Sequence, residues 1–176
     1  MLDLRQDFFA LFGLTPAFSI DMGRLEQAYL DIQGKVHPDR FAHSPDAEKR
    51  LSMQWATYAN EAFRTLKSPL TRGHYLLELR GVDPAFETNK AMSSEFLMEQ
   101  MEWREALGEA RDAADEDTLE ELSRRIRQST KTLVDQLAVQ LDECVDLAAA
   151  ADSVRRLKFL EKLQHEINDA LMALES

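Results

Sequence analysis

Apolar residues recur at steps of three and four along most of this 176-residue chain, and this spacing limits the possible folds more than any other feature. After Asp21 the stripe runs through Leu25, Tyr29, Ile32 and Val36. Such a repeat places apolar side chains on one face of an α-helix. The chain also has only six glycines and five prolines, which is few for a sandwich or barrel with many turns. We therefore predict an all-α fold.

Prolines, glycines and capping residues divide the first 80 residues into short and long helices. Pro38 has no N–H and disfavours helical geometry at the residue before it, so one helix ends near His37. Ser44 then supplies a capping hydroxyl and Pro45 a first helical residue for the next helix. The helices are predicted at residues 4–12, from Asp21 to His37, from Ser44-Pro45-Asp46 to Ser68-Pro69, and at about 70–80, ending at Gly81.

The rest of the chain is predicted to form a three-helix bundle after a connection at residues 81–92, which has no apolar stripe. The first helix is capped by Ser93 or Ser94, and Asp117-Thr118-Leu119-Glu120 resembles the capping box of the second. The second stripe continues to Val145, which places Cys144 on the same helix as a small apolar residue. The third helix follows Ala148–Ala151, and its stripe is Leu160, Leu163, Ile167, Leu171 and Leu174. The predicted domains are 1–80 and 93–176, joined by 81–92.

Charge is distributed unevenly between these parts. The whole chain has a net charge of −11, and residues 1–80 contribute zero because 10 Lys/Arg balance 10 Asp/Glu. The negative charge of the C-terminal part argues against nucleic-acid binding there. No apolar run approaches the length of a membrane span, the N-terminus is too acidic for a signal peptide, and a single cysteine fits a reducing compartment. We expect a cytoplasmic protein that binds neither nucleic acid nor membranes.

The segment GKVHPDRFA at residues 34–42 places an imidazole and a carboxylate between two predicted helices. Read from residue types alone, it is a plain turn, a metal site formed by His37, Asp39 and His43, a catalytic pair, or a docking loop. Metal binding needs a further ligand, and catalysis lacks an evident nucleophile. We therefore expect no catalytic residues, no metal and no cofactor, and the plain turn and the docking loop stay open.

The context of this tripeptide resembles the J-domain family. His37-Pro38-Asp39 lies between an amphipathic helix and an Ala- and aromatic-rich one, and NEAFRTLKSPLTRGHYLL at residues 60–77 is similar to the family's third and fourth helices. The resemblance implies a helical hairpin with short flanking helices that docks on a DnaK-type chaperone and stimulates its ATP hydrolysis. The chaperone-binding residues it implies are His37, Pro38, Asp39, Arg40, Lys35 and Arg24. Family members usually carry more cations before the tripeptide than this chain does.

The first helix of the C-terminal part has two apolar faces. With a step of about 100° per residue, Phe96, Trp103, Leu107 and Ala110 fall together as the core stripe. Leu97, Met101 and Met98 lie at about 100°, 140° and 200° from Phe96, beside Glu102, Glu105 and Glu109. An exposed Leu-Met-Met patch with an acidic rim is typical of a partner-binding site, although the same residues could also pack under the connection or the first domain. On the last helix, Phe159 lies at the edge of the core stripe.

The strings FLMEQMEWREAL (96–107) and RRLKFLEKL (155–163) extend the resemblance to HscB-type J-domain co-chaperones of iron–sulfur cluster assembly. The resemblance implies that the chain binds an IscU-type scaffold and delivers it to an HscA-type chaperone. The scaffold-binding residues it implies are Leu97, Met98, Met101, Glu102, Glu105, Glu109 and Phe159. Other hypotheses are a general J-domain co-chaperone with a different client, a non-catalytic helical scaffolding protein, and a metal-dependent hydrolase.

Overall fold

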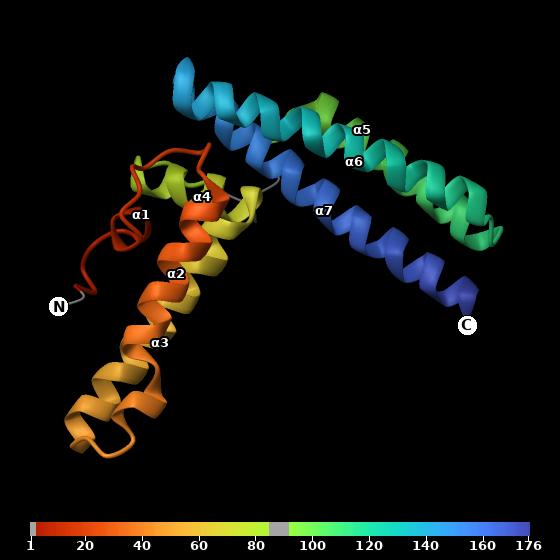
Figure 1. Cartoon of the computed structure of the whole chain (residues 1–176). Coiled ribbons are helices and arrows are strands. Elements are labelled where there is room, and N and C mark those ends of the chain that lie inside the picture. Colours follow the sequence, from red (N-terminus) through yellow and green to blue (C-terminus); the bar gives the residue numbers. More distant parts are fainter. Residues whose placement is uncertain (1–2, 85–91) are drawn as a thin grey trace. The chain divides into compact units, whose positions relative to one another are not determined.

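The computed structural model describes residues 3–84 and 92–176, and every regular element in these ranges is a helix (Figure 1). This confirms the predicted all-α fold. Two compact units are present, an N-terminal unit, Met1–Leu76, and a C-terminal unit, Leu77–Ser176. The predicted connection at 81–92 stays a prediction, and its residues 85–91 lie outside the described ranges. No helix of the described residues combines the length and apolar character needed to cross a bilayer.

A pair of packed helices, α2 and α3, forms the centre of the N-terminal unit. Asp21 caps α2 by accepting a 3.1 Å hydrogen bond from the Arg24 N–H. Leu25 of α2 and Leu66 of α3 are both buried, at 0% exposure. The helices of this part are α1 (Phe8–Leu11), α2 (Met22–Val36), the 3-10 helix η1 (Pro38–Phe41), α3 (Asp46–Lys67) and α4 (Pro69–Leu79).

Aromatic contacts attach the N-terminal segment to α3 and α4. The Phe8 ring stacks on Tyr75 with 4.5 Å between centroids, and the Phe8 N–H donates to the Tyr75 hydroxyl at 3.0 Å. The Tyr58 hydroxyl donates to the Gln6 carbonyl. The predicted helix at 4–12 shortens to Phe8–Leu11, because Asp7 caps it by accepting a 2.9 Å hydrogen bond from the Ala10 N–H.

The predicted cap of α3 was wrong. Pro45, rather than Ser44, occupies the N-cap position, and no side chain accepts a capping hydrogen bond there. Asp46 and Glu48 lie in the first turn, where negative charge interacts favourably with the helix dipole. The acidic residues therefore stabilise this end through their charge, and no side chain supplies the hydrogen bond predicted for the Ser44 hydroxyl.

Residues 92–176 of the C-terminal unit form three long helices and one π-helical turn. Ser93 caps the first by accepting a 3.2 Å hydrogen bond from the Phe96 N–H. A buried cluster joins the helices through residues such as Leu107, Leu119 and Leu163, as expected for a bundle. The elements are α5 (Ser94–Asp112), α6 (Glu116–Ala138), the π-helical η3 (Val139–Glu143) and α7 (Leu147–Glu175).

Two predicted boundaries in this unit were wrong. Asp115, not Asp117, caps α6 by accepting from the Thr118 N–H at 3.0 Å. Ala114 precedes it with a φ of 50°, which reverses the chain before α6 begins. The start of the last helix was also misplaced. Asp146 caps α7, so Ala148–Ala151 lie inside this helix, whereas the prediction placed them before it.

The second helix also ends earlier than its apolar stripe predicted. The π-helical turn of η3 follows Ala138, and the helical register changes there because such a turn holds an extra residue. Cys144 and Val145 therefore lie beyond the helix and are exposed, Val145 at 62%. The placement of Cys144 as a small apolar residue on a long helix was thus wrong. Leu174, at the end of the last stripe, is also exposed, at 39%.

Candidate functional site

The His-Pro-Asp tripeptide lies on an exposed loop between α2 and α3. The ψ of His37 is 130°, the extended value that a following proline favours, so α2 ends there. The His37 Nδ1 accepts a 3.3 Å hydrogen bond from the Asp39 N–H and lies 3.6 Å from the Asp39 carboxylate. The two side chains are nevertheless 51% and 91% exposed. The loop therefore presents both polar groups to solvent.

Two hydrogen bonds hold this loop against the end of α2. The buried Ser52 hydroxyl of α3 donates to the Val36 carbonyl at 2.6 Å, and the Arg40 Nη1 donates to the Gly34 carbonyl at 2.6 Å. Both bonds satisfy carbonyls that the end of a helix leaves without partners. The role of Ser52 was not predicted from the sequence. Ser52 lies seven residues before the buried Ala59 and therefore on the same face of α3. This spacing was the available signal in the sequence.

The other predicted chaperone-binding residues are also at the surface. Pro38 and Arg40 belong to the exposed 3-10 turn, Lys35 lies in the last turn of α2, and Arg24 lies in its first turn. Arg40 is the one that the structure ties to the loop geometry, through its bond to Gly34. Lys35 and Arg24 instead belong to α2 itself, one near each end of the helix.

The two faces of α5 differ sharply in exposure. Phe96 and Leu107 are 1% and 3% exposed and face the bundle core. Leu97, Met98 and Met101 are 36%, 62% and 71% exposed. The helix thus leaves an apolar patch in solvent, which we call the methionine patch. The predicted rim residues Glu102, Glu105 and Glu109 are exposed as well.

A shallow groove of about 620 Å³ crosses the methionine patch and is lined by Leu97, Gln100, Met101, Arg104 and Glu105. Arg104 was not among the site residues predicted from the sequence. Its Nη1 lies 2.9 Å from a Glu166 carboxylate oxygen of α7, and its guanidinium lies 5.7 Å from the centre of the Phe159 ring. Its angular position on α5, next to that of Leu97, was the signal in the sequence that could have placed it in the groove.

Phe159 lies behind the groove and not among the residues that line it. Its ring meets Phe96 edge to face, with 5.9 Å between centroids, and it is half-buried. Arg104, which lines the groove, thus also contacts the Phe159 ring of α7.

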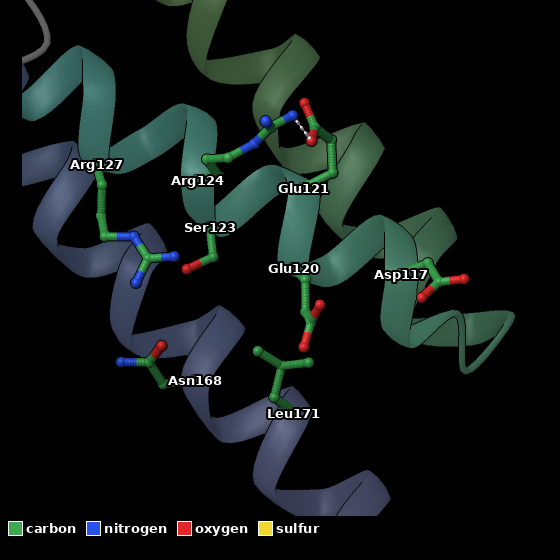
Figure 2. A pocket seen from close by; sticks show the side chains of 8 residues that line it. All are labelled: Asp117, Glu120, Glu121, Ser123, Arg124, Arg127, Asn168 and Leu171. Atoms are coloured by element: carbon green, nitrogen blue, oxygen red, sulfur yellow. Dashed lines mark hydrogen bonds and ion pairs between the residues drawn. The ribbon is translucent and has the colours of Figure 1, made fainter.

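A second hollow lies between α6 and α7 and is mostly polar (Figure 2). Figure 2 shows Glu121 paired with Arg124 on α6, with Asn168 and Leu171 on the facing side of α7. None of the predicted site residues lines it. Neither this hollow nor the rest of residues 3–84 and 92–176 contains three His, Cys, Asp or Glu side chains grouped to hold a metal ion, so His37, Asp39 and His43 do not form such a group.

A helical hairpin with an exposed His-Pro-Asp loop, followed by a helical C-terminal unit, defines a J-domain-type co-chaperone fold. The human co-chaperone HscB superposes with a TM-score of 0.88 at 30% identity, covering 95% of this chain and 83% of that one. The chaperone HscB from Vibrio cholerae gives a TM-score of 0.84 at 36% identity, covering 96% and 99% of the two chains.

Sequence comparisons give the family. A model described as the HSCB C-terminal oligomerisation domain matches residues 92–168. The co-chaperone protein HscB homolog of Aromatoleum aromaticum is 61% identical over 175 residues, 99% of each chain. That of Cupriavidus taiwanensis is 49% identical over 172 residues, covering 98% of this chain and 97% of the other. The chain therefore belongs to the HscB family of co-chaperones, which confirms the resemblance seen in its sequence.

Proposed function

We propose that this chain is the co-chaperone that binds an IscU-type iron–sulfur scaffold and delivers it to an HscA-type chaperone, whose ATP hydrolysis it stimulates. In this proposal the C-terminal unit holds the scaffold and the His-Pro-Asp loop docks on the chaperone. Its relatives are named as co-chaperones, a class without catalysis of its own. The observation that carries the proposal is the exposure of the methionine patch on α5, whose other apolar face, with Phe96 and Leu107, packs in the bundle core. We infer a cytoplasmic location from the same relationship.

The loop is suited to docking because its groups are both exposed and held in place. The 91% exposed carboxylate of Asp39 is an acceptor for a bidentate bond from an arginine of the partner. Pro38, together with the Ser52 and Arg40 hydrogen bonds, restricts the loop before binding. Less conformational freedom is then lost on docking.

The methionine patch is suited to a partner with its own apolar surface. Methionine side chains are flexible and polarisable, so they adapt to the shape that they meet. Glu102, Glu105 and Glu109 add negative charge around the patch, which favours a scaffold with basic residues beside the contact. Phe159, whose partly exposed ring lies beside Arg104, is the proposed scaffold contact from α7.

Two binding sites on one chain raise the effective concentration of scaffold beside chaperone. Delivery therefore requires both sites but no chemistry by the chain itself. The proposed division of labour follows the predicted domains, residues 1–80 for the chaperone and 93–176 for the scaffold.

Substitutions separate the two sites. We expect His37→Gln to abolish stimulation of the chaperone's ATPase while scaffold binding stays at the parent level, because His37 is exposed and far along the chain from α5. Full stimulation by this variant would contradict the docking role.

The converse variant combines Leu97→Ala, Met98→Ala and Phe159→Ala. It should weaken scaffold binding in a calorimetric titration and preserve stimulation by the chain alone. A circular dichroism melt checks that the half-buried Phe159 site still folds. Titration curves equal to those of the parent would count against the methionine patch.

A further inference from the structure

Ion pairs of opposite direction join α5 to α7 in the C-terminal unit. Near the start of α5, the Glu99 carboxylate lies 3.0 Å from the Arg156 Nη1 of α7. Further along α5, the Arg104 Nη1 lies 2.9 Å from the Glu166 carboxylate of α7. The anion is on α5 in the first pair and on α7 in the second, so sliding one helix along the other would break both pairs.

The two arginines of these pairs also contact aromatic rings. The Arg156 guanidinium lies 4.9 Å from the centre of the Phe96 ring, and the Arg104 guanidinium lies 5.7 Å from the centre of the Phe159 ring. The rings themselves meet edge to face, with 5.9 Å between centroids. The contacts therefore form one continuous network across both helices. Its members, in order, are Glu99, Arg156, Phe96, Phe159, Arg104 and Glu166.

One end of this network lies at the groove of the methionine patch. Arg104 lines the groove together with Leu97 and Met101, whereas Glu166 is not among the residues that line it. An arginine side chain has many rotamers, and fixing one of them when a partner binds costs free energy. The Glu166 carboxylate holds the Arg104 guanidinium in one place before any partner arrives. Its influence on the groove therefore passes through Arg104.

We propose that Glu166 is a positioning residue for scaffold binding, because its ion pair keeps the Arg104 guanidinium beside the Phe159 ring and out of the apolar part of the groove. The inference rests on the proposed function, since it concerns the same scaffold and the same groove. The scaffold meets a groove whose cation is already fixed, so less side-chain freedom is lost when the complex forms. The expected effect is that of a partly exposed ion pair, since Arg104 and Glu166 are 45% and 29% exposed.

The test measures the Kd of an IscU-type scaffold by calorimetric titration into the full chain and its variants. Glu166→Gln should raise this Kd roughly threefold, which is the effect of losing one partly exposed ion pair. Asp169→Asn is the matched control, because it removes the same charge from an exposed position three residues further along α7. This control should leave the Kd at the value of the parent chain.

A double-mutant cycle separates positioning from a direct contact or a weakened fold. Once Arg104→Gln has removed the cation, adding Glu166→Gln should not change the Kd further, because Glu166 acts through Arg104. If Glu166 contacted the scaffold itself, or only stabilised the fold, the two losses would add. Additive losses overturn the inference, as does an unchanged Kd for Glu166→Gln or an equal change with Asp169→Asn. If the parent chain does not bind the scaffold, the proposed function itself fails.

Discussion

Replacing both exposed methionines of α5 with alanine should separate partner binding from stability. Met98 and Met101 are 62% and 71% exposed, so the folded chain loses few contacts when they are truncated. Substitutions at such surface positions usually change the free energy of unfolding by no more than ~0.5 kcal/mol. The double variant should therefore unfold at nearly the same denaturant concentration as the parent.

The effect on scaffold binding follows from the area that a partner can still cover. Complete burial of a methionine is worth ~1.5–3 kcal/mol, and about two thirds of each side chain remains available for burial by the scaffold. Allowing for the methyl group that alanine keeps, each truncation costs about 1 kcal/mol. Together they should raise the Kd roughly thirtyfold.

Isothermal titration of the purified scaffold into parent and variant measures this change directly. Met172→Ala is the matched control, because Met172 of α7 is 67% exposed and does not line the groove. The reasoning is refuted if the double variant binds with the Kd of the parent, or if Met172→Ala weakens binding equally.

Other predictions concern stability and reactivity. Ser52→Ala should lower the free energy of unfolding by ~1–3 kcal/mol, since it leaves a buried carbonyl of α2 without its partner; urea denaturation measures the loss, and Ser52→Thr is the conservative comparison. Burial raises the pKa of Glu161 above its ordinary value of 4.5, so the fold favours the protonated acid and stability falls as pH rises from about that value through the folded pKa. Glu161→Gln should thus raise the melting temperature at pH 7 and lose this advantage at pH 4; an equal gain at both would contradict the burial argument. The exposed Cys144 thiol should react with Ellman's reagent in the folded chain, and protection until unfolding would contradict its position.

The faces of helices were predictable because their period is a property of the backbone. On α5, Phe96 and Leu107 turned inward and Met101 outward, as a fixed angle per residue requires. The apolar pattern of a single helix is therefore enough to predict which of its sides is buried and which is exposed to solvent.

Helix ends were less predictable because several residues compete for each cap. Asp115 and Asp117 can both accept from backbone N–H groups, and the positive φ of Ala114 decides between them. Similarly, the apolar stripe that reached Val145 assumed an unbroken α-helix. The π-helical turn at Val139–Glu143 shifts the register by an added residue, which no periodic pattern contains.

The groove could not be predicted in full from the pattern of α5, because it depends on contacts with another helix. At the groove, Arg104 contacts Glu166 and Phe159 of α7. At the His-Pro-Asp loop, Ser52 donates to a carbonyl of α2. Each of these contacts joins residues that are 16 or more positions apart. The angular positions of residues on one helix do not show which residues of other helices they contact. The exposed residues of the candidate sites were therefore predicted, and the residues that position them were not.

The proposed function requires that chaperone and scaffold bind different surfaces of the same chain, and the rate of ATP hydrolysis tests this requirement. ATP hydrolysis by an HscA-type chaperone is followed with the chain alone, with an IscU-type scaffold alone, and with both. We predict a rate with both that exceeds the sum of the separate stimulations, and the loss of this excess with His37→Gln. A combined rate no greater than that sum would contradict the account.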